Sequence, residues 1–241
     1  MSFAGDSLAC VRGERLVFET LSFRVEPGGA LLLTGPNGSG KSSLLRLCAG
    51  LLAPASGRLL WQGGTVEPEV HRTRLRYVGH LDAVKPVLTV AENLDFWARL
   101  AGGGIVAAAL DKVGLARLAE VPARLLSAGQ RRRLALARLA LRPADLWLLD
   151  EPTVGLDVQS RRLLLDHVHA LCAERGTGVL WATHLVDEAS EDSRIVLLRR
   201  GRVVMDAPAS EVARAAGDRD LAATLERKLR EDGERDAPRA I

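Results

Sequence analysis

The chain has 241 residues, of which 47% are hydrophobic and 26% charged, a composition typical of a water-soluble globular protein with one large domain or two small ones. Its 33 basic and 30 acidic residues leave a formal net charge of +3, with the arginines spread along the chain, so nucleic acid is not an expected partner. No apolar run approaches the roughly 20 residues of a membrane-spanning helix, and residues 1–6 lack the features of a secretion signal. The sequence therefore predicts a cytoplasmic chain that does not itself cross a membrane.

Residues 8–33 have the pattern of short strands joined by turns. The ranges 16–18 and 21–25 are rich in residues that favour strands, and Pro27-Gly28-Gly29 is typical of a turn. A small antiparallel β region is therefore expected at the N-terminal end of the domain.

The strongest motif of the sequence follows directly. A short apolar run at 29–34 leads into residues 35–42, GPNGSGKS, which fit the pattern G-x-x-x-x-G-K-[ST], and a helical repeat continues over 43–49. Glycines allow backbone N–H groups to point inward around a phosphate, and the N-terminus of the following helix adds partial positive charge. A glycine-rich turn that only joins two elements is the alternative, but strand, helix, lysine and serine all agree with a phosphate loop.

This loop predicts the chemistry of its ligand. Lys41 is expected to reach the β- and γ-phosphates of a nucleotide, and the Ser42 hydroxyl is expected to coordinate Mg²⁺. The motif thus indicates nucleotide binding, a metal ion and phosphoryl transfer, while it leaves the kind of P-loop protein open. The predicted phosphate-binding residues are Gly35, Pro36, Asn37, Gly38, Ser39, Gly40, Lys41, Ser42 and Ser43.

From Thr89 onward the pattern becomes helical. Thr89 and Glu92 have the spacing of a capping box, and the helix that they begin is expected to end at the three glycines 102–104. Further helices are expected over 106–113 and 130–141, the second stopped by a proline.

The next strand ends in acidic residues. Residues 146–151, LWLLDE, read as a buried strand with two carboxylates at the edge where open α/β sheets place ligands. Asp150 can hold Mg²⁺, and Glu151 can orient and deprotonate an attacking water as general base. Two acidic residues that only close a strand before a proline turn are the alternative. A helix over 159–173 and a strand over 179–182 follow and complete the α/β core.

Residues 126–130, LSAGQ, lie at the start of an arginine-rich amphipathic helix, and on this motif the chain resembles the ATP-binding subunits of ABC transporters. The family signature is L-S-G-G-Q, and Ala128 replaces its first glycine. The resemblance implies an α/β P-loop NTPase with a RecA-like core, an N-terminal antiparallel β region and an inserted α-helical subdomain. The expected boundaries are 1–205 for the ATP-binding domain, 5–79 and 143–205 for its core, 80–142 for the helical subdomain and 206–241 for a charged helical tail.

The resemblance also assigns further residues. Gly155-Leu156-Asp157 matches the family's D-loop, and His184 matches the histidine that contacts the γ-phosphate. Family members sandwich two ATP molecules between two subunits, so Ser127 and Gly129, with Gln130 beside them, are expected to complete the phosphate site of a second copy. The implied cofactors are ATP and Mg²⁺, and the implied activity is ATP hydrolysis that drives movement of membrane subunits.

Two positions depart from the family pattern. Arg12 stands where many relatives have an aromatic residue that stacks on adenine, and its planar guanidinium can stack too. His80 replaces the usual glutamine of the Q-loop, and its neutral imidazole can accept a hydrogen bond from the attacking water or from a metal-bound water. His80 is therefore expected to act in catalysis together with Glu151 and His184.

One segment points to a subgroup of the family. Residues 79–94, together with residues 8–13, look like the haem-exporting ATP-binding subunits of bacterial cytochrome c maturation. That likeness implies integral membrane partner subunits, a peripheral place on the cytoplasmic face of the inner membrane, and haem as cargo. Residues 152–157 and 181–188 look more like ABC subunits associated with quinoprotein alcohol dehydrogenases, or like drug and lipid exporters. A soluble ABC ATPase without a transport role is a further alternative.

Two charged segments have plainer predicted roles. Arg131, Arg132 and Arg133 form the densest basic run, which fits a solvated helix face at least as well as a nucleic-acid patch. The tail from Ala209 is expected to form one or two exposed helices that keep the chain soluble.

Overall fold

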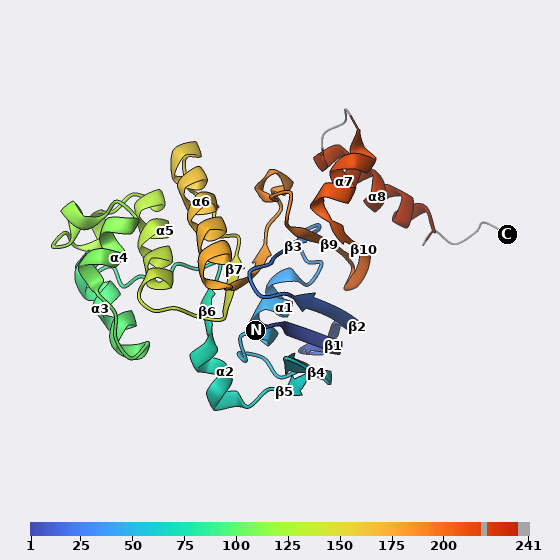
Figure 1. Cartoon of the computed structure of the whole chain (residues 1–241), viewed down its shortest axis with the longest axis horizontal. Helices are drawn as coiled ribbons and strands as arrows, with labels where there is room; N and C mark the ends of the chain where they lie inside the picture. The colour runs from blue at the N-terminus through green and yellow to red at the C-terminus, as the bar shows by residue number, and fades with distance from the viewer. Residues whose placement is uncertain (218–220, 236–241) are drawn as a thin grey trace.

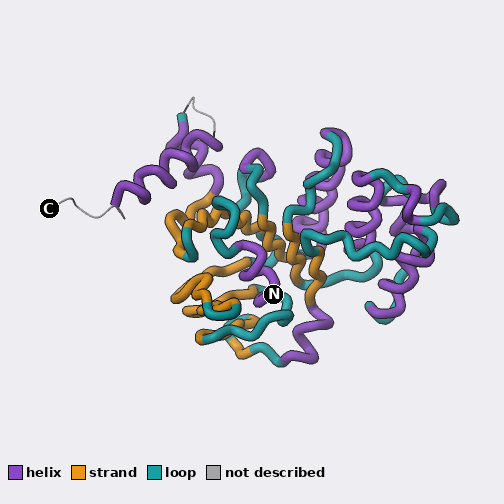
Figure 2. The backbone as a smooth tube through the Cα atoms, turned by 180° about the vertical axis from the view of Figure 1, so that it is seen from behind, coloured by secondary structure: helices purple, strands orange, loops and turns teal. Residues whose placement is uncertain are grey.

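The computed structural model describes residues 1–217 and 221–235 as two β-sheets with helices around them. Figure 1 shows the sheets in the middle of the molecule, a group of helices from the middle of the chain at one end, and two C-terminal helices at the other. Figure 2 shows the same order from behind, with the strands between the two helical ends. Among the described residues, no helix is long and apolar enough to span a membrane.

The N-terminal sheet is antiparallel and has the strand order β2-β1-β4-β5. Strands β1 (Phe3–Arg12) and β2 (Arg15–Val25) form a hairpin. Strands β4 (Ser56–Trp61) and β5 (Gly64–Thr65) complete the sheet on the other side of β1. The N-terminal antiparallel region predicted from the sequence is therefore confirmed.

The hairpin strands are longer than the sequence predicted. The ranges 16–18 and 21–25 are parts of one strand, because β2 continues through the polar residues between them. Register shifts in the β1–β2 pairing absorb the irregularity, and Thr20 takes a φ of 53° there. Bulges of this kind keep a ladder continuous where a simple alternation of side chains fails.

The second sheet has six strands in the order β10-β9-β3-β8-β7-β6. Strands β9, β3, β8, β7 and β6 pair in parallel, and β10 pairs antiparallel with β9. The central strands are continuous apolar runs because both faces of the sheet are covered. The bounds are β3 (Ala30–Thr34), β6 (Leu75–Val78), β7 (Leu146–Asp150), β8 (Gly178–Ala182), β9 (Arg194–Arg199) and β10 (Arg202–Pro208).

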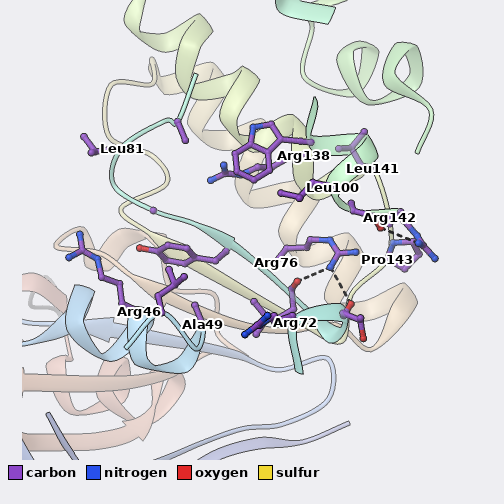
Figure 3. Close-up of a pocket in the computed structure, with 18 of the residues that line it drawn as sticks. Arg46, Ala49, Arg72, Arg76, Leu81, Leu100, Arg138, Leu141, Arg142 and Pro143 are labelled. Atoms are coloured by element: carbon purple, nitrogen blue, oxygen red, sulfur yellow. Dashed lines mark hydrogen bonds between the residues drawn. The ribbon is translucent and has the colours of Figure 1, made fainter. Parts of the chain in front are cut away.

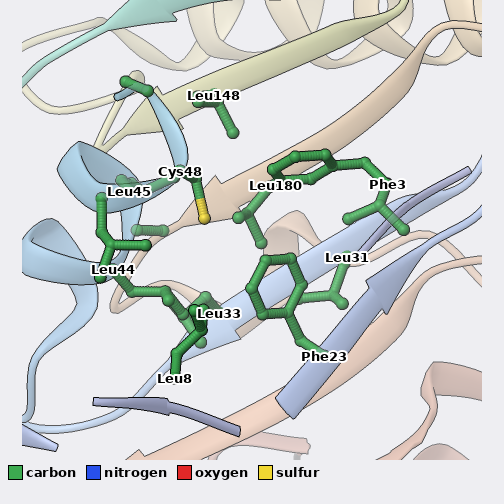
Figure 4. Close-up of a cluster of buried hydrophobic side chains, with 14 of the residues drawn as sticks. Phe3, Leu8, Phe23, Leu31, Leu33, Leu44, Leu45, Cys48, Leu148 and Leu180 are labelled. Carbon is green, nitrogen blue, oxygen red and sulfur yellow. The ribbon is translucent and has the colours of Figure 1, made fainter. Parts of the chain in front are cut away.

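Helices cover both faces of this sheet. Helix α1 (Lys41–Cys48) lies between the two sheets, and its leucines belong to a buried cluster that includes Phe3 of β1 and Leu148 of β7 (Figure 4). Helix α6 (Val158–Arg175) packs on the other face, where its apolar residues join a second buried cluster. A short helix, α2 (Pro68–Arg74), leads into β6.

The helical group has a hydrophobic core of its own. It consists of α3 (Val90–Leu100), α4 (Val106–Lys112) and α5 (Ala128–Ala137), joined by loops and 3₁₀ turns. The capping box at Thr89 is confirmed, because its hydroxyl accepts from the Glu92 N–H at 3.1 Å and the Glu92 carboxylate accepts from the Thr89 N–H at 2.7 Å. The limits of a subdomain around this group remain a prediction.

Helix α5 is displaced from its predicted bounds of 130–141. It begins two residues earlier because Ser127 and Gln130 form a second capping box. The α-helix ends at Ala137 and continues as a 3₁₀ turn over residues 138–140, which tightens the last turn before the chain enters β7.

The chain after residue 205 differs from the predicted charged helical tail, 206–241. Its first residues complete β10, and α7 (Ala209–Ala216) and α8 (Leu221–Arg235) follow. Residues 218–220 and 236–241 of the predicted tail lie outside the described residues.

The prediction that these last helices are exposed is wrong for one face of each. Val212 of α7 and Leu225 of α8 are only 4% and 3% exposed, and both belong to the cluster that covers the six-stranded sheet. An ion pair between Arg199 of β9 and Asp232 of α8, at 2.8 Å, adds a polar contact. The helices are amphipathic, so their charged residues indicate only the face that is exposed to solvent.

Candidate functional site

The predicted phosphate loop, residues 35–42, connects β3 to α1 at the edge where the parallel strands end. Gly35 has a φ of 141°, and a Cβ at this position would lie 2.0 Å from the carbonyl oxygen of Leu198, so only glycine fits. Gly40 precedes the first turn of α1 with a φ of 112°. The loop thus presents the N-terminus of α1 at the sheet edge, where its partial positive charge favours an anion.

Lys41, the first residue of α1, is only 6% exposed. Its ammonium donates hydrogen bonds to the carbonyl oxygens of Gly35 and Pro36, at 2.6 and 3.2 Å. Burial lowers the pKa of Lys41, and the nearby carboxylates of Glu151 and Asp150 oppose that shift. A cation is thus fixed inside the loop, where it can interact with phosphate oxygens.

Ser42 and Asp150 join the start of α1 to the end of β7. The Ser42 hydroxyl donates to Asp150 Oδ1 at 3.0 Å. Asp150 is 1% exposed, and within the described part of the chain its Oδ2 has no hydrogen-bond partner. Burial raises the pKa of Asp150, while the bond from Ser42 lowers it. A hydroxyl beside a carboxylate with a buried, unpartnered oxygen suits Mg²⁺, which prefers oxygen ligands.

Glu151 follows β7 in a strained conformation. Its φ of 49° lies in the left-handed region, which costs a residue with a side chain on the order of 1 kcal/mol. The N–H of Glu151 donates to the carbonyl oxygen of Ala182 at 2.8 Å and so fixes one side of the residue to β8. Backbone strain that the surrounding structure holds in place is typical of functional sites.

Two histidines flank the Glu151 carboxylate. His80 Nδ1 lies 3.4 Å from one carboxylate oxygen, and His184 Nδ1 lies 3.6 Å from the other. The three side chains and the phosphate loop line one open cavity of about 610 Å³, a size in the range of ligand pockets. The structure therefore brings together the three predicted catalytic residues. The lining residues are Gly35, Pro36, Asn37, Gly38, Ser42, His80, Glu151 and His184.

The predicted signature and D-loop residues are not among those lining residues. Ser127 caps α5, and Gln130 completes the cap with bonds of 2.8 and 3.2 Å between the two residues. A Cβ at Gly129 would lie 3.1 Å from the carbonyl oxygen of Gly155, so the start of α5 lies close to the D-loop. Asp157 caps α6, and the hydrogen bonds that its carboxylate accepts there lower its pKa.

Three further residues that were predicted to bind nucleotide lie in different parts of the structure. Arg12 lies exposed at the end of β1 and does not line the cavity, so its stacking on adenine stays a prediction. Ser39 is 3% exposed, and its backbone N–H donates to the carbonyl oxygen of Pro36 at 3.2 Å, so it is part of the hydrogen-bonded backbone of the loop. Ser43 lies half-buried in the first turn of α1, directly after Ser42.

The prediction of a solvated arginine face is wrong for Arg132. This residue is 3% exposed, and its guanidinium bonds to backbone carbonyl oxygens beyond the ends of β6 and β7. Arg132 and Leu136 lie one helical turn apart on the buried face of α5, and that spacing is the sequence signal that identifies its burial. Arg131 and Arg133 donate to carbonyl oxygens within the helical group instead.

A buried carboxylate, which the sequence did not single out, joins the turns around the cavity. Glu188 is 4% exposed and accepts hydrogen bonds from the Thr153 hydroxyl and, at 3.0 Å, from the Trp181 indole N–H. Burial raises the pKa of Glu188, and these hydrogen bonds oppose the shift. The turn that follows Glu151 is thereby tied to β8, the strand that leads to His184.

A second and larger cavity, of about 840 Å³, lies between the helical group and the part of the core formed by α1, α2 and β6 (Figure 3). We call it the arginine cleft, because five arginines line it and no acidic residue is among its lining residues. Leu81 and Leu100 at this cavity are 79% and 70% exposed. The arginines are Arg46, Arg72, Arg76, Arg138 and Arg142.

Arg138 is the most buried of these arginines, with 7% of its surface exposed. Its guanidinium lies over the ring of Trp97, 4.7 Å from the ring centroid, and its Nε has no hydrogen-bond partner among the described residues. Burial and the nearby charge of Arg132 lower the pKa of Arg138 to about 10. His80 lines both the arginine cleft and the nucleotide cavity, so one side chain lies between the two.

The sequence is similar to known proteins of one family. The model of the ABC transporter family matches residues 18–154, more than half of the chain. The chain is 59% identical to the cytochrome c biogenesis ATP-binding export protein CcmA of Rhodospirillum rubrum, over 76% of this chain and 79% of that protein. The proteins of the same name from Paramagnetospirillum magneticum and Rhodopseudomonas palustris are 54% and 49% identical, over 76% of this chain and 88% and 92% of theirs.

Solved structures of low sequence identity share the fold. A structure of the ATP-binding subunit of an ABC transporter has a TM-score of 0.83 at 24% identity, over 95% of this chain and 100% of that chain. A bacterial Atm1-family ABC exporter with ATP bound has a TM-score of 0.80 at 23% identity, over 100% of this chain and 42% of that chain. The predicted α/β P-loop fold is confirmed. The chain therefore belongs to the ABC transporter family, in which it is an ATP-binding subunit that hydrolyses ATP.

Proposed function

We propose that this chain hydrolyses ATP to drive an export step in cytochrome c biogenesis, with haem as the cargo. Relatives that carry the name of that process share 49% to 59% of their residues with it over three quarters of its length. The structural observation that carries the hydrolytic part is the Glu151 carboxylate between His80 and His184, beside the phosphate loop. The haem cargo rests on the resemblance of residues 79–94 to haem exporters.

Ser42 and Asp150 are the proposed ligands of Mg²⁺. When bound, the ion would neutralise charge on the β- and γ-phosphates. Asp150 Oδ2 supports this assignment, because a buried carboxylate oxygen without a partner is costly unless a cation or donor meets it. Lys41, held in the loop by two carbonyl oxygens, would add a second positive charge beside the phosphates.

Glu151 is the proposed general base, and the two histidines orient it. In the neutral form, an imidazole that donates from one nitrogen to the carboxylate can still accept a hydrogen bond from a water at its second nitrogen. The attacking water would give its proton to a Glu151 oxygen while His80 and His184 each orient one oxygen of the carboxylate. The strained φ of Glu151 supports this role, because strain is retained where geometry matters for function.

A second copy of the chain is proposed to complete the nucleotide site. Ser127, Gly129 and Gln130 begin α5 but do not line the cavity of their own chain. The N-terminus of a helix favours phosphate, so α5 of one copy can face the phosphate loop of the other. Asp157 would lie near that contact, and Arg12 is the proposed platform for adenine. ATP would then hold the two copies together, and hydrolysis would release them.

The arginine cleft is the proposed docking site for an acidic, partly apolar segment of an integral membrane subunit. Five arginines without a carboxylate among the lining residues favour a negatively charged occupant. The exposed side chains of Leu81 and Leu100 would cover apolar residues of that segment. Attachment through this cleft would make the chain a peripheral subunit on the cytoplasmic face of the bacterial inner membrane.

Deletion of the gene tests the proposed cargo. We expect loss of c-type cytochromes during respiratory growth, restored by the wild-type gene but not by the Glu151→Gln variant. Normal cytochrome c levels after a clean deletion would rule out the haem proposal. Full restoration by Glu151→Gln would instead contradict the general-base role and leave the cargo proposal standing.

A further inference from the structure

Arg132 holds the backbone on both sides of the catalytic glutamate. Its Nη2 donates to the carbonyl oxygens of Asp150 and Glu151, at 3.0 and 2.7 Å, and its Nε donates to that of Pro152 at 2.9 Å. The three acceptors are consecutive, and Glu151 in the middle has the left-handed φ of 49°. Arg132 therefore bonds to the carbonyl oxygens before, at and after a residue whose N–H is already fixed to β8.

The remaining donors of Arg132 reach the segment that carries His80. Nη1 donates to the carbonyl oxygen of Gly79 and to Asp82 Oδ1, both at 3.0 Å, so its acceptors lie on either side of His80. All five N–H donors of the guanidinium are then used, and the side chain is 4% exposed. Arg132 thus binds the segments of two of the three residues that meet in the nucleotide cavity.

We propose that Arg132 is a positioning residue that sets Glu151 and His80 relative to each other and links their geometry to helix α5. It contacts neither the phosphate loop nor the cavity, so it acts through backbone and not on the nucleotide. Because Arg132 lies on the same helix as Ser127 and Gly129, a shift of α5 would move the base. The inference rests on the proposal that Glu151 is the general base.

Only arginine can make this set of contacts. Its planar guanidinium presents five donors in fixed directions, whereas the ammonium of lysine has three donors at a single point. A lysine at position 132 keeps the buried positive charge and can still pair with Asp82. It cannot, however, bond to the segment of Glu151 and the segment of His80 at the same time. Arg132→Lys is therefore a conservative change that selectively removes the link.

The test compares Arg132→Lys with Arg133→Lys in the full chain. Arg133 lies next to Arg132 on α5, but it donates to Val113 inside the helical group and so serves as the matched control. We expect Arg132→Lys to lower ATP turnover by about 10- to 100-fold, as for a base displaced by an ångström or so. Its affinity for ATP should stay within about twofold of wild type, and Arg133→Lys should keep near-normal turnover. Wild-type turnover in Arg132→Lys would overturn the proposal.

The double variant Arg132→Lys/Glu151→Gln separates positioning from general support of the fold. If Arg132 acts through Glu151, the double variant should hydrolyse ATP no more slowly than Glu151→Gln alone. If the two substitutions instead multiply their losses of ATP turnover in full, and the unfolding temperature also falls, Arg132 has a structural role only. That result would overturn the inference. Unchanged turnover in Glu151→Gln alone would instead refute the base on which the inference rests.

A second variant keeps the test decisive if Arg132→Lys does not fold. Asp82→Ala removes the charged acceptor at a site whose side chain is 28% exposed and leaves the arginine and its backbone bonds in place. We expect turnover to fall by a few-fold with ATP affinity unchanged, because the segment of His80 loses one of its two contacts to Arg132. Turnover equal to wild type would contradict the proposed link.

Discussion

The nucleotide cavity and the arginine cleft meet at His80 but are built in opposite ways. At the nucleotide cavity the charged side chains have partners within the chain: Lys41 bonds to loop carbonyls, one oxygen of Asp150 accepts from Ser42, and the Glu151 carboxylate lies beside two histidines. In the cleft the arginines have no carboxylate among the lining residues. A site for a small ligand is preorganised by its own groups, whereas a docking surface is completed by the charges of its partner.

Glu151→Gln gives the largest expected effect and tests the nucleotide side of this comparison. Loss of a general base should lower ATP turnover by about 10²- to 10⁴-fold while ATP binding is retained. The variant should accumulate as an ATP-bound dimer, which size-exclusion chromatography with light scattering would detect. Glu191→Gln, an exposed glutamate outside both cavities, is the control and should behave as wild type. Undiminished turnover in Glu151→Gln would show that the base lies elsewhere.

His80→Ala tests whether the shared side chain connects the two cavities. We expect turnover to fall by about 10-fold, because the Glu151 carboxylate loses one of its two orienting partners. Stimulation of turnover by the membrane subunits should disappear as well, measured with the reconstituted complex. His80→Gln should keep most of the turnover and most of its stimulation by the membrane subunits, because an amide can donate and accept hydrogen bonds. Full stimulation in His80→Ala would mean that the cavities communicate by another route.

Arg142→Glu tests the cleft alone. Arg142 is exposed at the cleft, and reversal of its charge should weaken binding of an acidic membrane segment by about 10-fold at low salt and less at high salt. ATP binding by the isolated chain should not change. Arg202→Glu on β10, also exposed but far from the cleft in sequence and sheet order, is the matched control. Equal binding by both variants would remove the cleft as the docking site.

The smallest expected effect concerns His71 of α2, whose hydrogen bonds connect α2 to β4 and to the end of α1. His71 is 3% exposed, accepts from the Trp61 indole at 2.9 Å, and with its other nitrogen donates to the carbonyl oxygen of Cys48, the last residue of α1, at 2.7 Å. Its neighbour Arg72 lines the cleft. Burial lowers the pKa of His71 below its usual 6.5, and the bond to Cys48 opposes the shift.

The sign of the pH effect follows from that lowered pKa. As pH falls below about 6.5 the unfolded chain takes up a proton that the folded chain excludes, so the free energy of unfolding decreases until the lowered native pKa is passed. His71→Gln keeps a donor and an acceptor but does not titrate. Between about pH 7 and 5.5, the wild-type melting temperature should therefore fall further than that of His71→Gln. Parallel curves for the two proteins would contradict this account.

The nucleotide cavity could be predicted from the sequence because its residues lie in short local patterns. The phosphate loop is one continuous motif, and Asp150 and Glu151 directly follow a short apolar run of the length typical of a buried strand. His80 and His184 required a family resemblance, because no local spacing connects them to Glu151. Their meeting at one carboxylate depends on strand order in the sheet, which hydrophobic pattern does not encode.

The arginine cleft could not be predicted in the same way. Its lining residues extend from Arg46 to Pro143 and converge only when the helical group packs beside the sheet. The prediction for Arg132 was wrong because a run of three arginines resembles a solvated face until one side of the helix is known to be buried. The prediction that the last helices are exposed was wrong for a similar reason, because their many charged residues surround a narrow apolar stripe.

The stacking of Arg138 on Trp97 gives the molecule an optical reporter of its own. Indole fluorescence responds to a cation at the ring face, so a carboxylate that draws the guanidinium away would change the emission of Trp97. No tryptophan is among the described residues that line the nucleotide cavity. With the other tryptophans replaced by phenylalanine, the emission of Trp97 would therefore report the arrival of a docking peptide at the cleft without a direct contribution from bound nucleotide.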